Sequence, residues 1–556
     1  MNVNTEYHTF KIFMKTKNIF VILLLVNLMM FTDNDADAAS SYGKALLEIM
    51  KVKPSTDAEM EDTFLEDRDT VVEFFPNDVK FLNMTLKDCI YHACKNNYDI
   101  EIASFDPPIS DAEIKVEKSV FDPILNITGQ TQDSETPSNS LLQLGLGSSL
   151  SDFSVDTQTL DAKAEKLWST GATFTLDFNI NQVHLDPSPF AFFNPFVDSY
   201  IEAKINQPLL RNAGIFYNRS NIYIARNNKK ISLLQFKETA IRVINDVQRI
   251  YWELVKAIED LKVRNKSLER AKDLLRKNRV QARVGTMAPI DVLEAEEGVA
   301  KQVEGVIIGE NNVGNKEDEL KQIMNFRRGS ILSDASIIPL DRPPFEIKKV
   351  SLDESIQIAM KNRPELFVQG LDIANAKINV KQKRNQLLPK LDFEAGIRYT
   401  GLAANKGNSL DSTFSQDFQS EFFQVVLEVP LGNREARNNY SKAKLEATKS
   451  VLGRRKLEQS IVVEVRTAVR QIKTNIERVK ASAKAKELAQ ERLEAEEKKF
   501  KVGRTTSLEV VRAQENLAIA EGRAINARVD YQVSLGNLEA VQGTIIEKNS
   551  IVIEEY

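Results

Sequence analysis

Two kinds of hydrophobic pattern alternate along the chain. In short stretches apolar residues recur at every second position, as in ATFTLDFNI and KLDFEAGIRY, which is typical of half-buried β-strands. In much longer stretches they recur at every seventh position, as in Ala240, Val247, Leu254, Leu261, Leu268, Leu275 and Ala282. Sustained heptads predict helices that pack as coiled coils. The pattern therefore predicts an α+β fold in which strands lead into very long helices.

The alternating stretches carry polar residues opposite their apolar residues. In KLDFEAGIRY, Phe393 and Ile397 share one face, whereas Glu394 and Arg398 share the other. A soluble sheet with one wet face has this pattern, and so does a transmembrane barrel with lipid outside and a polar lumen inside. Alternation alone leaves both interpretations open.

The same order of elements occurs twice. VGTMAPIDVLEAEEGVA begins at Val284, and the similar VGRTTSLEVVRAQENLA begins at Val502. Self-similarity over this length predicts a duplicated unit, with a first repeat at 84–330 and a second at 350–545. We expect strands at about 121–210 and about 388–431, and helical hairpins at about 217–325 and about 434–543. The offset between matching segments falls from 266 to 222 within the first repeat, so that repeat carries 44 extra residues, which leaves its strand count open.

Each Val-Gly stretch is predicted to be the tip of a helical hairpin. Gly285 and Gly503 are free to adopt the left-handed conformation that ends a helix. Thr286 or Thr506 is expected to begin the next helix, with Pro289 in its first turn. The chain then reverses and runs back antiparallel.

The remaining segments have simpler predictions. Basic residues, the apolar run IFVILLLVNLMMF and the small residues ADAAS predict a secretory signal peptide at 1–38. Three further segments are expected to be a periplasmic arm at 39–83, a linker at 331–349 and a tail at 546–556. No later segment has 18 consecutive apolar residues, so we expect any membrane crossing to be made by strands.

Composition and motifs argue against catalysis and nucleic-acid binding. The net charge of −5 gives no basic footprint for nucleic acid. Cys89, His92 and Cys94 lie on a predicted helix, where their spacing points the side chains apart, so we interpret them as structural and expect no metal. GLGSS at 145–149 lacks the third glycine of a dinucleotide loop. We therefore expect no cofactor and no enzyme activity.

Together, the signal peptide, the two repeats, the strand pairs, the Val-Gly tips and QPLLRNAG resemble the TolC family of outer-membrane efflux proteins. The resemblance implies an outer-membrane homotrimer. Each protomer would contribute four strands to one twelve-stranded transmembrane β-barrel in outer-membrane lipid. The helical hairpins would form a coiled-coil α-helical barrel, a tunnel across the periplasm. The implied function is a passive conduit for efflux or type I secretion.

The resemblance also implies where partners and ions meet the channel. A periplasmic adaptor protein and an inner-membrane RND or ABC transporter would dock at the tips, on Val284, Gly285, Val502 and Gly503. Acidic residues would line the periplasmic entrance, at Glu509 and in the position that Arg512 occupies here. Asp291 and Glu294 hold the same places in the first repeat. The alternative for all four residues is that they are solvated charges at a helix start.

A second function class remains beside the channel. A periplasmic coiled-coil adaptor or scaffold would also have a signal peptide and long helical hairpins, but it would form no pore. Two in-line repeats favour the channel, because adaptors usually have one hairpin. The cargo and the class of partner pump stay open.

Overall fold

The structure, a computed structural model, describes residues 50–52, 81–137, 152–186, 188, 191–326, 335–549 and 551–553. The chain divides into two compact units. The sheet unit contains the described residues of Ser110–Asn228 and Asp372–Ser450, and the helical unit contains those of Ser41–Ile109, Lys229–Leu371 and Val451–Tyr556. The predicted signal peptide, most of the predicted arm and the GLGSS stretch lie outside the described residues.

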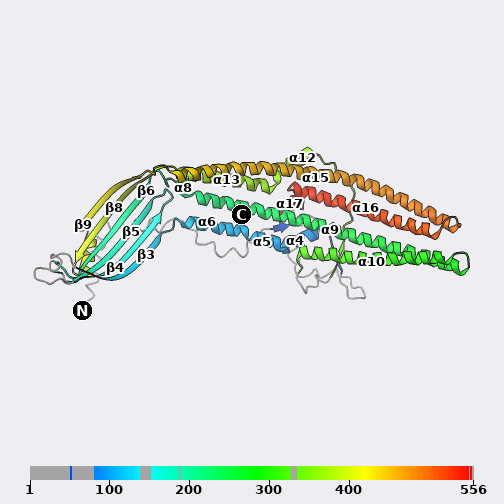
Figure 1. Ribbon diagram of the computed structural model, residues 1–556, viewed down its shortest axis with the longest axis horizontal. Helices are drawn as coiled ribbons and strands as arrows, with labels where there is room; N and C mark the ends of the chain where they lie inside the picture. Colours follow the sequence, from blue (N-terminus) through cyan, green and yellow to red (C-terminus); the bar gives the residue numbers. More distant parts are fainter. Residues whose placement is uncertain are drawn as a thin grey trace, which may run out of the picture. The chain divides into compact units, whose positions relative to one another are not determined.

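The sheet unit is built around one antiparallel sheet of six strands, drawn in cyan to yellow in Figure 1. The strands are β3 (Ile124–Pro137), β4 (Asp152–Leu167), β5 (Thr173–Asp186), β6 (Phe196–Pro208), β8 (Lys390–Ala403) and β9 (Phe418–Glu428). Their order in space equals their order in the sequence, and each pairs antiparallel with the next. The family pattern has four strands, and the 44 extra residues of the first repeat left the count for this chain open; the sheet has six. The extra residues of the first half of the chain add a complete hairpin, β4–β5.

The two faces of the sheet differ in chemistry. One cross-strand row joins Ala162, Phe178, Ile201 and Tyr399, and the next joins Ala164, Leu176, Ala203 and Ile397. On the opposite face a row of charges joins Lys163, Asp177, Glu202 and Arg398. Because side chains alternate along every strand, each register row stays on one face of the sheet. The alternation read from the sequence is therefore present across the strands.

A short helix, α14 (Lys406–Ser415), follows β8 in the sequence and packs on the apolar face against β6 and β8. Asn405 caps it by accepting a hydrogen bond from the backbone N–H of Asn408. The Ser199 hydroxyl lies 2.8 Å from the Ser409 hydroxyl and 2.7 Å from the Thr413 hydroxyl. These contacts require the helix backbone to approach the sheet closely, which Gly401 permits because it has no side chain.

The helical unit is built from two long hairpins. The first consists of α9 (Ser220–Arg283) and α10 (Pro289–Met324), and the second of α15 (Arg434–Lys501) and α16 (Ser507–Val541). The long helices α9 and α15 begin in the sheet unit. Shorter helices complete the chain: α4 (Leu86–Asn96), α5 (Tyr98–Ser104), α6 (Asp106–Ser119), α8 (Ile215–Asn218), α12 (Leu352–Asn362), α13 (Pro364–Asn385) and α17 (Ile545–Lys548). No helix in the described ranges has the length and apolar character needed to cross a membrane.

The predicted heptad columns are buried over much of their length. On α9, Ala240, Val247 and Leu254 are fully buried. On α15, the side chains of Val465 and Ile472 are at most 1 % exposed. Toward the tip of α9 the buried positions shift to Ser267, Ala271, Leu274 and Asn278, so Leu268 and Leu275 are only half-buried. A straight α-helix has 3.6 residues per turn, so its inner face drifts away from a strict seven-residue column. The continuous column predicted for α9 is therefore wrong near its tip.

Two small strand pairs tie together segments that are far apart in the sequence. β1 (Met50–Val52) pairs antiparallel with β10 (Ile551–Ile553), and β2 (Phe81–Met84) pairs parallel with β7 (Ser336–Pro339). Tyr251 of α9 is fully buried and donates its hydroxyl proton to Asp341, at 2.9 Å. The predicted linker 331–349 thus contains a strand and is held against the helices.

Candidate functional site

The first hairpin tip is a helix end closed by a left-handed glycine. Gly285 has φ +80°, and its N–H donates to the carbonyl of Ala282, at 3.1 Å. The next N–H, of Thr286, donates to the carbonyl of Gln281, at 2.9 Å. This pair of bonds is the Schellman motif, which satisfies carbonyls that the ending helix leaves without partners.

The second tip has the same backbone. Gly503 has φ +71°, and its N–H donates to the carbonyl of Phe500, at 3.0 Å. Arg504 N–H donates to the carbonyl of Lys499, at 2.9 Å. A Cβ built on either tip glycine would meet no atom within 4 Å, so the glycines are required by backbone conformation alone. The left-handed turns predicted from the sequence are confirmed.

The starts of the returning helices differ between the tips. Thr506 is the N-cap of α16, as expected, although its side chain makes no capping hydrogen bond. The N-cap of α10 is Ala288, and Pro289 follows in the first turn. The expectation that Thr286 begins α10 is therefore wrong. Its hydroxyl instead donates to the carbonyl of Gln281, at 3.0 Å, so Thr286 completes the preceding helix.

Apolar side chains are exposed at both tips. Val284 is 72 % exposed and Val502, at the same position of the second tip, is 68 % exposed. Ile290 and Leu293 add to this surface on α10. Matching exposed valines on two independent turns are what a docking surface for another protein requires, because apolar area is available for burial.

The candidate entrance residues lie just beyond the tips. Arg512 pairs with Glu509 at 2.7 Å, one turn along α16, and the two side chains are 57 % and 38 % exposed. Asp291 is half-buried at the start of α10, and its carbonyl accepts a hydrogen bond from the side chain of Asn278. Glu294 is half-buried on the next turn. Within one chain the structure joins only the Glu509–Arg512 pair among these four.

A buried polar link between the hairpins was missed by the sequence analysis. Asn278 of α9 is fully buried, and its amide donates to the Ser507 hydroxyl of α16, at 2.6 Å. The same amide donates to the carbonyl of Asp291 in α10, at 3.1 Å. One side chain therefore fixes three helices beside the tips. An asparagine in a heptad column was the available signal, because a buried polar residue specifies helix register.

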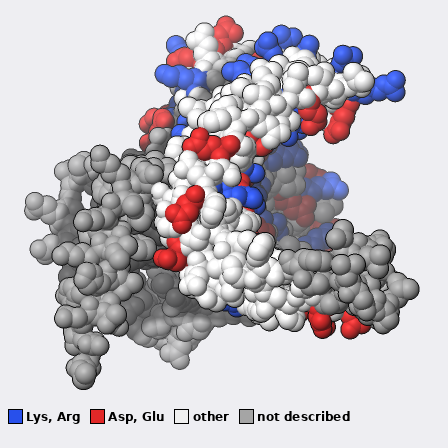
Figure 2. Space-filling model, turned by 90° about the vertical axis from the view of Figure 1, so that its left-hand side faces the viewer, with Lys and Arg blue, Asp and Glu red and all other residues white. Residues whose placement is uncertain are grey.

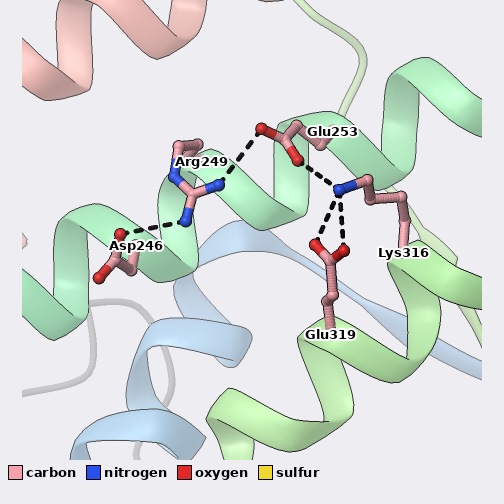
Figure 3. A network of polar contacts seen from close by, with 5 residues as sticks. All are labelled: Asp246, Arg249, Glu253, Lys316 and Glu319. Atoms are coloured by element: carbon pink, nitrogen blue, oxygen red, sulfur yellow. Dashed lines mark hydrogen bonds and ion pairs between the residues drawn. The ribbon is translucent and has the colours of Figure 1, made fainter.

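A network of charges joins the two helices of the first hairpin (Figure 3). Lys316 of α10 lies 2.9 Å from Glu253 of α9 and 2.8 Å from Glu319. Arg249 extends the network to Asp246 on α9. Burial alone would raise the pKa of Glu253, but Lys316 and Arg249 outweigh burial and hold that pKa below its usual range. The network fastens α9 to α10 and was not predicted.

The charged face of the sheet is internally compensated in part. Arg398 of β8 pairs with Glu202 of β6 and lies over the ring of Tyr200, 4.4 Å from its centroid. Lys163 and Asp177 continue the row on β4 and β5. Figure 2 shows uncharged residues interrupted by acidic and basic groups. One face thus suits water and ions, and the other suits an apolar medium.

The cysteines lie in the interior of the helical unit. Cys89 and Cys94 are free, and both belong to its largest buried apolar cluster. Burial raises the pKa of each thiol to about 12. Neutral, buried thiols are poor nucleophiles and poor metal ligands. Among the described residues, no group of three or more His, Cys, Asp or Glu side chains is placed to hold a metal ion.

Comparison with known proteins places this arrangement in a family. Residues 355–544 match the family described as "Outer membrane efflux protein". The outer membrane protein TolC of Vibrio cholerae is 24 % identical over 318 residues, which cover 57 % of this chain and 70 % of that protein. TolC of Escherichia coli is 24 % identical over 309 residues, which cover 54 % of this chain and 62 % of that protein. These matches support the assignment of the chain to the TolC family of outer-membrane efflux proteins.

Solved structures of outer-membrane channels share the fold. The Campylobacter jejuni CmeC outer membrane channel superposes with a TM-score of 0.59 at 16 % identity, over 84 % of this chain and 89 % of that one. The sequence alignments span about two thirds of the length of the two TolC proteins. The proteins that it resembles are located in the outer membrane, which supports the same location for this chain, and TolC-type channels are not enzymes.

Proposed function

We propose that this chain is the outer-membrane channel of an efflux or secretion system, a passive conduit across the outer membrane and periplasm. The sheet is the observation that supports this most strongly. Two of its apolar rows span five strands, and its opposite face holds Lys163, Asp177, Glu202 and Arg398 in one row. Lipid on the apolar side and water on the charged side satisfy both faces.

The conduit requires several copies of the chain. A single open sheet cannot line a pore, so the protomers share one barrel, and we propose the homotrimer of the family pattern. The chain is an internal duplication in which each half supplies strands followed by a helical hairpin. Three copies of both hairpins form the coiled-coil tunnel across the periplasm. Residues 1–38 are removed as a signal peptide.

The tips are the proposed docking surface for a periplasmic adaptor, which in turn engages an inner-membrane RND or ABC transporter. Val284 and Val502 are exposed at equivalent positions beside Gly285 and Gly503, which supports one partner meeting both tips. Three copies of Glu509 at one constriction favour cations, and each Glu509 pairs with Arg512 on the same helix. Asp291 and Glu294 contribute from the first tip.

The alternative function is a periplasmic coiled-coil scaffold without a pore. Planar-bilayer recording of the purified, detergent-solubilised protein separates the two functions. We expect discrete conductance steps that favour cations over anions. A preparation that is folded by circular dichroism but produces no steps contradicts the channel and favours the scaffold. The Glu509→Ala variant serves as a matched control for selectivity, because it removes the proposed charge ring while leaving the sheet intact.

A further inference from the structure

The six-stranded sheet has two open edges. Among the described residues, no strand pairs with the outer side of β3 or with the outer side of β9. Both strands keep apolar side chains strongly exposed, with Leu125 at 65 %, Ile127 at 66 % and Phe423 at 76 %. In a hydrocarbon environment every backbone N–H and C=O must be paired, so both edges require a partner strand.

The direction of the strands allows a second copy of the chain to be that partner. Six strands that alternate in direction place the first and the last antiparallel to each other. Pairing β9 of one copy with β3 of the next therefore continues the antiparallel sheet. Leu125 and Ile127 lie on the same face of the sheet as Phe423, Val425 and Leu427. The cross-strand rows that start at Leu125 and Ile127 reach Glu421 and Gln419 on β9, and every second residue from these positions lies on that face. The apolar face stays continuous across the junction.

The register of the sheet matches the slant of a closed barrel. The row that starts at Ile124, the first residue of β3, passes through Glu165, Thr175, Lys204 and Gly396 and reaches Phe422. Phe422 lies six positions before Glu428, the last residue of β9. Suppose that Glu428 of one copy lies opposite Ile124 of the next copy. The cross-strand row is then displaced by six residues over six strands, which is one residue per strand. A barrel with that ratio has strands tilted by about 36°, within the range of outer-membrane barrels.

The β4–β5 hairpin is an integral part of this wall. Its turn is fixed at the end of the sheet where β6 ends, because Gly214 N–H donates to the carbonyl of Thr170, at 3.0 Å. Gly171 adopts φ +96° there, and a Cβ on it would lie 2.6 Å from the carbonyl oxygen of Asn212. The hairpin continues the charged row with Lys163 and Asp177 and the apolar row with Ala162 and Phe178.

We propose that three copies of this chain close an 18-stranded barrel, with β9 of each copy paired to β3 of the next. This inference rests on the proposed trimeric channel and replaces the twelve strands of the family pattern. Barrel diameter grows roughly linearly with strand number, so the opening in the membrane is about 1.5 times as wide as that of a twelve-stranded barrel. Sixteen to eighteen strands are enough to leave an aqueous channel. The exit therefore accommodates wider cargo than the four-strand pattern allows.

The test compares the full chain with a variant in which residues 138–195 are replaced by a short turn. The deletion removes β4 and β5 and lets β3 pair with β6. β6 runs antiparallel to β3, and the apolar side chains of both strands stay on one face of the sheet. Native mass spectrometry counts the chains, and single-channel recording finds the largest neutral polymer that enters from the loop side. We expect three chains in both proteins and a polymer cut-off radius about 1.5-fold larger in the full chain.

Two results would overturn the proposal: equal cut-offs in the two proteins, or an assembly of two full-length chains, which gives twelve strands. If neither protein forms pores, the proposed function fails instead, so the two failures are distinguishable.

A second measurement does not depend on the deletion variant folding. The double variant Ile127→Cys, Val425→Cys places thiols on the two edge strands at positions opposite each other when the strand ends are level. Oxidation in outer membranes should give covalent trimers, whereas the control Ala164→Cys, Val425→Cys, with one thiol on an inner strand, should stay monomeric. Two results contradict the 18-stranded barrel. In one, Ile127→Cys crosslinks with no cysteine placed at positions 421 to 427; in the other, covalent dimers are the end product.

Discussion

The strands that precede α9 and those that precede α15 belong to one sheet but differ in number. The first half of the chain contributes β3 to β6, and the second contributes only β8 and β9. The helical hairpins that follow are built alike, with the same glycine-closed turn at each tip. The two helical hairpins therefore share one turn design, whereas the two strand groups differ by one β-hairpin.

The two strand groups also differ in what lies between their strands. The first group inserts a complete hairpin whose turn is anchored on Gly171, whereas the second inserts α14 between its strands. An added antiparallel hairpin preserves the direction of every other strand, so a sheet can expand without changing the helices attached to it. In the proposed channel, the width of the membrane exit can therefore change without a change in the helical hairpins.

The largest expected effect comes from adding a side chain beneath α14. A Cβ at Gly401 would lie 2.1 Å from the carbonyl oxygen of Ser409 and 2.5 Å from the Thr413 hydroxyl. Gly401→Val should therefore displace α14 and lower the free energy of unfolding by about 1–3 kcal/mol or more. Gly129→Val in β3 is the matched control, because a Cβ there meets nothing within 4 Å. Thermal unfolding in detergent measures both. Equal midpoints would show that the second strand group tolerates the same change as the first.

A smaller effect is expected at the tips, where the two halves agree. Gly503→Val and Gly285→Val each force a side chain into a left-handed conformation, at a cost of about 1–2 kcal/mol. Gly314→Val in α10 is the control, since its Cβ also meets open space but its backbone is helical. Export and adaptor crosslinking should fall in both tip variants while membrane insertion is unchanged. Wild-type export in both tip variants counts against docking at the tips.

The ion network of the first hairpin should contribute less, because its members are partly exposed. Lys316→Met removes the link between α9 and α10 and should lower stability by less than about 1 kcal/mol at pH 7. The pKa of Glu253 is lowered in the folded state, so its contribution is present above the unfolded pKa and disappears as the pH falls through the folded pKa. The difference between wild type and Lys316→Met should shrink from pH 7 to pH 3.

Thermal unfolding at both pH values checks this prediction. Lys301→Met is the control, because Lys301 pairs with Glu297 on the same helix and joins nothing across the hairpin. A Lys316→Met effect that does not change with pH contradicts the assigned role of Glu253.

The smallest effect on stability is expected at the entrance. Glu509 and Arg512 form an exposed pair, and such pairs contribute between about 0 and 1 kcal/mol. Their effect should instead appear in the pore. Glu509→Ala should lower cation selectivity, measured as a reversal potential in a salt gradient, and Arg512→Ala should raise single-channel conductance. If both variants conduct and select like the parent, these residues are solvated charges at a helix start and the constriction lies elsewhere.

Local patterns predicted part of this structure well. The tip turns followed from single glycines between two heptad patterns, because a left-handed helix end is decided by one residue. The strands β5, β6, β8 and β9 followed from alternation, because their apolar faces hold large residues such as Phe178 and Phe423. β4 was missed, since only Leu160, Ala162 and Ala164 mark its apolar side and its remaining positions are mostly polar.

The candidate site was less predictable. The Asn278–Ser507 bond joins residues 229 positions apart, and no local pattern reports which side chains meet across packed helices. The Lys316–Glu253 pair likewise depends on how α9 and α10 align. The position of α14 was hidden because its serines, threonine and glycine resemble a loop, and its stability comes from close packing on Gly401. Tertiary contacts, and not propensity, fix these features.

The central claim is that this protein is a trimeric channel of the outer membrane. Fractionation of cells that express the full chain, followed by mass measurement in detergent, tests it most directly. The account predicts that the processed protein sediments with outer membranes and elutes as one species containing three chains. Recovery of the protein as a soluble monomer in the periplasm would contradict it.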